Sequence, residues 1–554
     1  MSSPPDAPPQ PSVSTPDGVP PSSPRPGPLA RTLAFLRNTW RGLTSMRTAL
    51  VLLFLLALAA MPGALLPQRS LNAFLVEDFY RDNPAVAPVI DAVGGFEVFA
   101  SPWFAAIYLL LMISLVGCVL PRTGEYWRAM RQQPVRTPRN LERLPHHDSG
   151  VVAGSADDIR RRALAQLRGW RRAERTEPDG AWAVSAEKGY LREAGNLVFH
   201  LSLIGILIGM AGGKLYGYDG DVIVRADGSE FCNSSILGYD SFNAGLRVDG
   251  TDLNQFCVKV DRFDGTWLPN GQASSFASQI GYQTAADLDA GSTQWRPYEL
   301  AVNHPLRTDG DRVYMTGYGY APTFTVTWPD GRSRTGEVQW RPVDQGGTQL
   351  SEGATKFERP GVTDPTLRRT SQLAVTGLLA PTGAVDPEGR LVSVHPDLRS
   401  PVADVDVMLG DLGIDDGRGQ SIFSVDQRNI DEGKLRSVAT ARLAIGDTVA
   451  LPDGTVVRFD GVTPWVNLLI GHDPAQVWVL VAAMTMVGGL TLSLTVRRRR
   501  VWIRVVPREG DARVELGGLA RTDRAGYGEE FERIARTMLR ENHDEDGRMR
   551  TDVV

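Results

Sequence analysis

The chain has 554 residues, a formal net charge of −5 and a hydrophobic content of 42%. This length exceeds one ordinary domain, and the mild charge gives no support for nucleic-acid binding. Three cysteines occur without a Cys-x-x-Cys pair, which disfavours a thioredoxin-like redox site and a zinc ribbon. Because Cys-x-x-Cys-His is also absent, the chain does not carry its own covalently attached c-type haem.

The N-terminal segment 1–30 is rich in proline, serine and glycine and has almost no large apolar residue. It cannot bury enough apolar surface to offset chain entropy, so we expect a disordered tail there. No apolar segment typical of a signal peptide lies near the start. The basic segment 31–47 has apolar residues at helical spacing, which predicts a helix lying on the membrane surface.

Four apolar runs are long enough to cross a bilayer, and they predict transmembrane helices over 48–66, 103–120, 193–213 and 475–496. Arginine is concentrated in 31–47, in the loop 123–192 and at the start of the tail 497–554. The short loop 67–102 is acidic. The positive-inside rule therefore places both termini and 123–192 in the cytoplasm, and 67–102 and 214–474 outside the cell membrane.

The segment 214–474 contains no further apolar run of spanning length. Strict alternation over 323–328 and 256–260, with a Pro-Asp-Gly turn signal at 329–331, predicts a β-rich domain of one or two lobes. A domain that only binds a partner is an open alternative. The predicted fold class is thus a polytopic α-helical membrane protein with a large β-rich extracytoplasmic domain between spans three and four. Within the cytoplasmic segments, 155–172 and 528–541 look helical.

His200 lies within the third apolar run, GNLVFHLSLIGILIGMAGG, in the part nearer its basic flank. An ionisable side chain inside a membrane is costly, so a ligand or proton role is the default interpretation. Neutral imidazole is a common axial ligand of haem iron. A purely structural hydrogen bond across a helix pair is the alternative. A separate stripe of glycines, four residues apart at Gly205, Gly209 and Gly213, predicts a packing face for another helix.

Cys232 and Cys257 both fall in the predicted exported domain, where a structural disulfide is favoured over a thiol pair that exchanges with a redox partner. Cys118 in the second span is expected to be a small packing residue. His472 lies just before the fourth span, at the membrane surface, where an exported haem could reach it. Apart from haem iron, no metal site is predicted, and no catalytic motif occurs in a credible context.

Several stretches together resemble the ResB family of cytochrome c biogenesis proteins. The similar stretches are FYRDNP at 79–84, SPWF at 101–104, SLVGCVLPR at 114–122, GYLREAGNLVFH at 189–200, VNHPL at 302–306, HDP at 472–474 and RVWI at 500–503. No single motif is decisive, but their order is specific, and the resemblance covers roughly residues 40 to 540.

The resemblance implies a CcsB-like subunit of the membrane cytochrome c synthetase of system II. Such a subunit works with a CcsA-type (ResC) membrane protein, binds or exports haem transiently, and supports its attachment to apocytochrome c on the outer face. The role of haem axial ligand would fall on His200. The Trp-rich haem-handling motif belongs to the CcsA-type partner, so this chain is not expected to be an enzyme on its own. A thioredoxin-like protein would keep the apocytochrome thiols reduced.

Two other functions are compatible with the residues. One is a membrane-anchored sensor or scaffold whose exported domain binds a ligand; it would leave c-type cytochromes normal after deletion. The other is a transporter, which is disfavoured because four spans are few and no inverted repeat is visible.

Overall fold

The computed structural model describes residues 28–71, 73–343, 347–417, 420–520 and 527–540. The predicted disordered tail 1–30 falls mostly outside these residues. The chain divides into two compact units. The first contains the chain up to Ile204 and from Ala482 onward, and the second contains Gly205–Val481.

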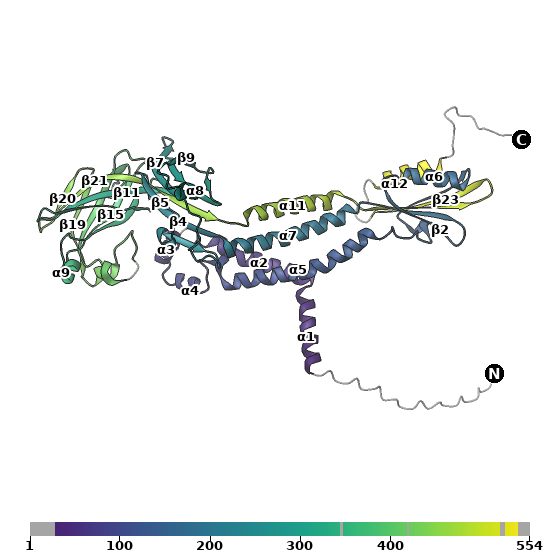
Figure 1. Cartoon of the computed structure of the whole chain (residues 1–554), viewed down its shortest axis with the longest axis horizontal. Helices are drawn as coiled ribbons and strands as arrows, with labels where there is room; N and C mark the ends of the chain where they lie inside the picture. The colour runs from purple at the N-terminus through teal and green to yellow at the C-terminus, as the bar shows by residue number, and fades with distance from the viewer. Residues whose placement is uncertain (1–27, 72, 344–346, 418–419, 521–526, 541–554) are drawn as a thin grey trace, which may run out of the picture. The chain divides into compact units, whose positions relative to one another are not determined.

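Four helices are long and apolar enough to cross a membrane, and they confirm the predicted four spans. They are α2 (Met46–Leu65), α5 (Pro102–Arg131), α7 (Leu191–Tyr216) and α11 (Gln476–Thr495) (Figure 1). The basic segment before α2 forms α1 (Pro28–Leu43). Pro121 lies inside α5, so the helix continues beyond the predicted end of the apolar run.

In the first unit, α2 and α5 pack against each other. Ser114 of α5 donates a hydrogen bond to the Leu43 carbonyl at 2.6 Å, which fixes the junction of α1 and α2. The segment that connects α2 and α5 is folded around Val76, Ala87 and Phe96. It contains α3 (Ala73–Asp82), α4 (Ala87–Ala92) and the 3-10 helix η1 (Val98–Ala100).

The Arg-rich loop and the C-terminal tail were predicted as a loop and a tail with two helices. The structure folds them together into one domain, called the α/β domain below. Its antiparallel sheet has the order β1-β23-β22-β3-β2 (Figure 1). Before α7 come the 3-10 helix η2 (Leu141–Arg143), β1 (His146–Ala153), α6 (Ala156–Gln166), β2 (Arg171–Thr176) and β3 (Trp182–Lys188). After α11 come β22 (Arg499–Pro507), β23 (Asp511–Ala520) and α12 (Tyr527–Leu539).

The core of the α/β domain forms because α6 and α12 cover the sheet with apolar side chains. Phe531, Ile534 and Met538 of α12 are buried, in agreement with the predicted apolar stripe. Helix α6 is shorter than the predicted 155–172, since Arg171 begins strand β2. The pairing of β3 with β22 brings the start of α7 and the end of α11 together.

In the second unit, the β-rich region between α7 and α11 confirms the predicted domain. Its largest sheet has the order β10-β11-β21-β4-β6, with β12 and β20 at its margins (Figure 1). The members are β4 (Tyr218–Arg225), β6 (Ser241–Ala244), β10 (Leu306–Thr308), β11 (Asp311–Thr327), β12 (Ser333–Glu337), β20 (Thr448–Ala450) and β21 (Val456–His472). The predicted alternating run 323–328 falls at the end of β11.

The long strands β11 and β21 contribute to two hydrophobic cores. One core includes Phe256 and Leu468, and the other includes Trp340 and Phe459. The first core is completed by β5 (Ser229–Cys232), β7 (Cys257–Trp267), β8 (Ala273–Gln283) and β9 (Arg296–Ala301). The second is completed by β13 (Arg341–Pro342), β14 (Ser351–Phe357), β15 (Leu373–Ala380), β18 (Val402–Gly410) and β19 (Leu435–Ala444).

Smaller elements connect these strands. They are β16 (Gly383–Val385), β17 (Leu391–Ser393), the 3-10 helices η3 (Ile236–Gly238) and η4 (Ile414–Asp416), and the short helices α8 (Ala285–Asp289), α9 (Pro365–Thr370) and α10 (Gln427–Asp431).

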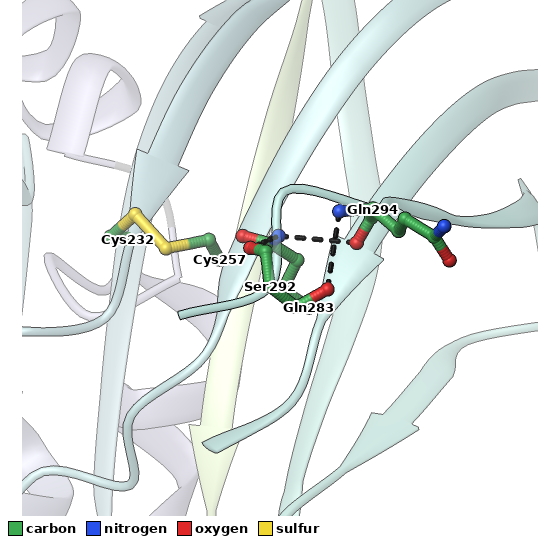
Figure 2. Close-up of a disulfide and its surroundings, with 5 residues drawn as sticks. All are labelled: Cys232, Cys257, Gln283, Ser292 and Gln294. Atoms are coloured by element: carbon green, nitrogen blue, oxygen red, sulfur yellow. Dashed lines mark hydrogen bonds between the residues drawn. A yellow bond between two sulfur atoms is a disulfide. The ribbon is translucent and has the colours of Figure 1, made fainter. Parts of the chain in front are cut away.

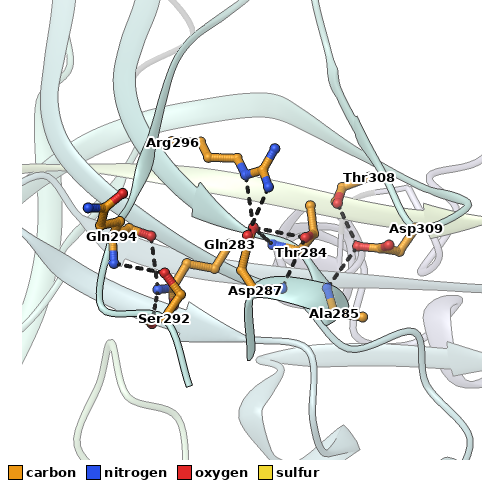
Figure 3. A network of polar contacts seen from close by, with 9 residues as sticks. All are labelled: Gln283, Thr284, Ala285, Asp287, Ser292, Gln294, Arg296, Thr308 and Asp309. Atoms are coloured by element: carbon orange, nitrogen blue, oxygen red, sulfur yellow. Dashed lines mark hydrogen bonds and ion pairs between the residues drawn. The ribbon is translucent and has the colours of Figure 1, made fainter. Parts of the chain in front are cut away.

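A capping box holds α8 between β8 and β9 (Figure 3). Asp287 accepts a hydrogen bond from the Thr284 backbone N–H at 3.0 Å, and the Thr284 hydroxyl accepts one from the Asp287 backbone N–H. Arg296 of β9 pairs with the same carboxylate at 2.8 Å. The hydrogen bonds from Arg296 and Thr284 hold the pKa of Asp287 well below its usual range, so the carboxylate is ionised at neutral pH.

The Thr284→Ala variant is expected to lose about 1 kcal/mol of local stability, because the N-cap acceptor is removed. Native-state hydrogen exchange of the amides in α8 and the facing ends of β8 and β9 measures this loss. Thr284→Ser keeps the hydroxyl and is the matched control. Equal protection in the alanine and serine variants would contradict the role assigned to the cap.

Candidate functional site

His200 lies in the third turn of α7 and is half-buried. Its ring nitrogen Nδ1 lies 2.8 Å from the carbonyl oxygen of Asn196, one helical turn earlier. A carbonyl oxygen only accepts hydrogen bonds, so Nδ1 carries a proton, and in the neutral form of the ring the lone pair lies on Nε2. Because this bond stays within one helix, it does not join α7 to another span. Nε2 remains the atom that can bind a ligand.

A cavity of about 40 Å³ lies beside His200 within the first unit. Its walls are formed by Met46 of α2, by Cys118, Val119, Arg122 and Tyr126 of α5, and by Asn196, Leu197 and His200 of α7. Cys118, Arg122 and Tyr126 are spaced by four, so they share one face of α5, as Asn196 and His200 share one face of α7. Pockets that enclose a small-molecule ligand usually measure about 300–1,000 Å³. This cavity is therefore too small to enclose a ligand of that size.

Glycines allow α7 and α11 to approach closely. In the first unit, a Cβ atom at Gly195 would lie 2.7 Å from the Gly489 carbonyl oxygen. In the second unit, a Cβ atom at Gly209 would lie 2.5 Å from Cγ2 of Val479. Small residues that let two backbones approach are typical of helix contacts in membranes. The glycines thus face α11, while His200 faces the cavity lined by α5.

A buried carboxylate lies just before α7 in the first unit. Glu187 is 2% exposed, accepts hydrogen bonds from Arg498 at 3.1 Å and from the Tyr190 hydroxyl, and forms an ion pair with Arg500 at 2.8 Å. Burial raises the pKa of Glu187, but these hydrogen bonds and the two guanidinium charges outweigh it and hold the pKa below its usual range. Arg498 also pairs with Glu193 of α7 at 3.4 Å. The cluster therefore connects the start of α7 to the residues that follow α11.

His472 belongs to a polar network at the edge of the second unit where the chain leaves α7 and enters α11. In the register of β11, β21 and β4, Asp311, His472 and Tyr218 lie side by side. Nδ1 of His472 lies 2.7 Å from Oδ1 of Asp311, and the Tyr218 hydroxyl donates to Oδ2 of Asp311 at 2.5 Å. The rings of Tyr218 and His472 are stacked, with centroids 5.3 Å apart. When Nδ1 donates to the Asp311 carboxyl group, Nε2 is the ring nitrogen of His472 that can bind a ligand.

Two asparagines complete the shell around Asp311. Asn254 donates to its Oδ1 at 2.7 Å, and Asn233 donates to its Oδ2 at 3.1 Å. Burial raises the pKa of the Asp311 carboxyl, although hydrogen bonds from Tyr218 and Asn254 act in the opposite direction. Burial and the bond to Asp311 raise the pKa of Tyr218 far above its usual value, so this hydroxyl stays protonated and donates.

The Cys232–Cys257 disulfide joins β5, which ends just before Asn233, to β7, which begins three residues after Asn254 (Figure 2). The two cysteines lie directly opposite each other in β5 and β7. The backbone N–H of Asn233 donates to the Phe256 carbonyl at 2.9 Å, next to the disulfide. Cys118, predicted to be a packing residue, has a free thiol and lines the His200 cavity.

His200 belongs to the first unit and His472 to the second. Arg122, Tyr126 and Asp311 were not predicted as site residues. For Arg122, the available signal is its spacing of four from Cys118 at the end of an apolar run. No such signal exists for Asp311, which reaches His472 only through strand pairing. Over the described ranges, no group of three or more His, Cys, Asp and Glu side chains is arranged to hold a metal ion.

Four helices long and apolar enough to span a membrane, with a β-rich domain between the third and fourth, define a class of multi-pass membrane protein. The sequence model of the ResB-like family matches residues 46–532. The chain therefore belongs to the ResB-like family.

Two relatives illustrate how far the similarity extends. The cytochrome c biogenesis protein CcsB of Synechococcus sp. (strain CC9605) is 24% identical over 522 residues, which cover 93% of this chain and 98% of the relative. The protein with the same name from Synechococcus sp. (strain CC9311) is 24% identical over 521 residues, covering 90% of this chain and 97% of the relative.

Proposed function

We propose that this protein acts in cytochrome c biogenesis as a haem-handling subunit of a membrane complex. Two relatives aligned over nearly their whole length are named cytochrome c biogenesis protein CcsB, which supports a role in that process. His200 supports the haem-handling role. The observation that carries the proposal is the hydrogen bond from Nδ1 of His200 to the Asn196 carbonyl. Histidines that bind metals almost always donate their other ring N–H to a carboxylate, a backbone carbonyl or a water molecule.

The donor set fits one side of a haem site. Neutral imidazole suits iron, and the Asn196 carbonyl fixes which nitrogen is offered. The cavity of about 40 Å³ is too small to enclose the macrocycle, so the proposed site needs further walls beyond the residues that line this cavity. A CcsA-type membrane protein is the partner that we propose for this role. Haem is the cargo of the complex, and the bond from His200 to its iron would hold it during transfer to apocytochrome c.

Charge distribution supports the proposed orientation. The α/β domain and the basic flanks of the spans would face the cytoplasm, and the β-rich domain would face the outside of the plasma membrane. The Cys232–Cys257 disulfide suits an oxidising compartment, which favours the same orientation. Because neither cysteine belongs to a Cys-x-x-Cys pair, a separate thioredoxin-like protein would reduce the apocytochrome thiols.

His472 is a candidate for a second haem ligand on the outer side. Its Nδ1 is held by Asp311, which is buried, and its side chain is 23% exposed. A carboxylate behind a histidine raises the basicity of the ligating nitrogen and fixes the ring. Haem that leaves the membrane would meet this histidine next to the end of the β-rich domain that adjoins α7 and α11.

The test compares wild type and His200→Ala, each purified with the co-expressed CcsA-type partner. The variant is expected to lose co-purifying haem in the visible spectrum and the maturation of c-type cytochromes. His304→Ala, which alters an exposed histidine of the β-rich domain, is the matched control and should behave as wild type. Unchanged haem content in His200→Ala would exclude the ligand role. Normal c-type cytochromes after deletion of the whole protein would favour a sensor or scaffold instead.

A further inference from the structure

The cavity beside His200 has a cation in the opposite wall. Arg122 projects from α5, four residues after Cys118 and four before Tyr126, and all three line the cavity. The wall formed by α7 thus offers an imidazole nitrogen, and the wall formed by α5 offers a guanidinium and a phenol. These groups belong to the same compact unit.

Arg122 forms no hydrogen bond and no ion pair with the residues that the structure describes. This contrasts with Arg498 and Arg500 of the same unit, which pair with Glu187. An arginine at the end of a membrane span is costly unless it reaches water or an anion. Arg122 is exposed, so water can reach it, and an anion that binds it would come from outside the described chain. A carboxylate of a bound ligand and a lipid phosphate are the two sources with the required chemistry.

Resting on the proposed haem-handling function, we propose that Arg122 binds a propionate carboxylate of the haem whose iron is bound by His200. A guanidinium can bind a carboxylate through two parallel hydrogen bonds, which fixes orientation as well as affinity. The Tyr126 hydroxyl is one turn further along the same face of α5 and can donate to the same carboxylate. Arg122 and His200 line the same cavity, which favours a haem propionate over a lipid phosphate as the anion.

This contact would make the site selective for the ionised propionate edge of haem. The iron bond alone does not distinguish one orientation of the macrocycle from another. The contact between Arg122 and a propionate would fix the orientation of haem, with its propionates toward α5. The vinyl groups, at which thioether bonds form, would then not contact α5. Arg122 is thus a positioning residue and not a ligand of the iron.

The test uses the full-length chain purified with its co-expressed partner, stripped of haem and titrated with haem or with haem dimethyl ester, whose propionates are esterified. Absorbance in the Soret region reports binding and ligation. Wild type should bind haem about tenfold or more tightly than the ester, as expected for a charge-assisted hydrogen bond. Arg122→Gln should bind both equally weakly, with the spectrum of the ligated iron unchanged at saturation. Arg122→Lys should retain part of the preference for haem.

Arg128→Gln is the matched control, because Arg128 lies on the same helix and does not line the cavity; it should retain the preference of wild type. An unchanged preference in Arg122→Gln, with or without a loss of co-purifying anionic phospholipid, would overturn the propionate role. If wild type binds neither compound, or His200→Ala keeps the wild-type spectrum, the haem-handling function itself fails.

Discussion

The Glu187→Ala variant is expected to lose about 3–5 kcal/mol of stability in the α/β domain. Removing one partner of a buried ion pair leaves the remaining charge without compensation. Here two guanidinium groups, those of Arg498 and Arg500, would lose a carboxylate that is 2% exposed. The Tyr190 hydroxyl would lose its acceptor as well.

Hydrogen exchange of the amides in β3 and β22 measures this loss directly, since it reports local opening in a chain with several units. Glu174→Ala is the matched control. Glu174 lies in the same sheet, and its ion pair with Arg160 is exposed, so its loss should cost less than about 1 kcal/mol. Equal effects of the two substitutions would show that burial of Glu187 contributes nothing.

The same carboxylate predicts a pH dependence. The pKa of Glu187 is lower in the folded protein than its usual value. A depressed folded pKa means that the stabilisation is present at neutral pH and is lost as the pH falls through the folded pKa. Protection of β3 and β22 should therefore decrease on acidification below the usual glutamate range, about pH 4.3, and Glu187→Ala should lack this component of the pH dependence.

Removing the Cys232–Cys257 disulfide is expected to lower the stability of the β-rich domain by about 3.5 kcal/mol. The bond closes a loop with a sequence separation of 25, and the chain-entropy relation gives this magnitude. The double variant Cys232→Ala/Cys257→Ala should show the loss in β5 and β7. Exposure of Asn233 and Asn254 to solvent should follow, because both lie close to the bond in sequence.

Chemical denaturation followed by hydrogen exchange in β5 and β7 gives the measurement. Cys118→Ala removes the third cysteine without touching a disulfide, so it should leave these strands unchanged. A double variant as stable as wild type would show that the strand pairing alone holds this part of the domain.

Sequence periodicity and charge were sufficient for the four spans and the β-rich domain. Apolar runs of spanning length need no knowledge of contacts, and alternation reveals strands locally. The α/β domain was missed because its two halves lie on either side of α7 and α11 in the sequence. Residues such as Lys188 and Arg499 pair only after the intervening segments have folded, and local patterns carry no signal for that pairing.

The candidate site was predictable in part. His200 was identified because an ionisable residue in an apolar run is unusual. The role of Asn196 in fixing its ring follows from the shared helix face. Arg122, by contrast, resembles an ordinary basic flank of a span until the packing of α5 brings it to the cavity. Asp311 could not be predicted as a partner of His472, because only the register of β11 and β21 places the two residues side by side.

The sheet shared by the Arg-rich loop and the C-terminal tail has a consequence for biosynthesis. Its strands β3 and β22 are more than 300 residues apart in sequence, so the sheet is dominated by long-range contacts, which form slowly. The ribosome completes β22 and β23 only after α11 has been made. A nascent chain therefore holds an incomplete sheet at the membrane surface throughout the synthesis of the β-rich domain. The sheet of the α/β domain can therefore be completed only after the segment that follows α11 has been synthesised.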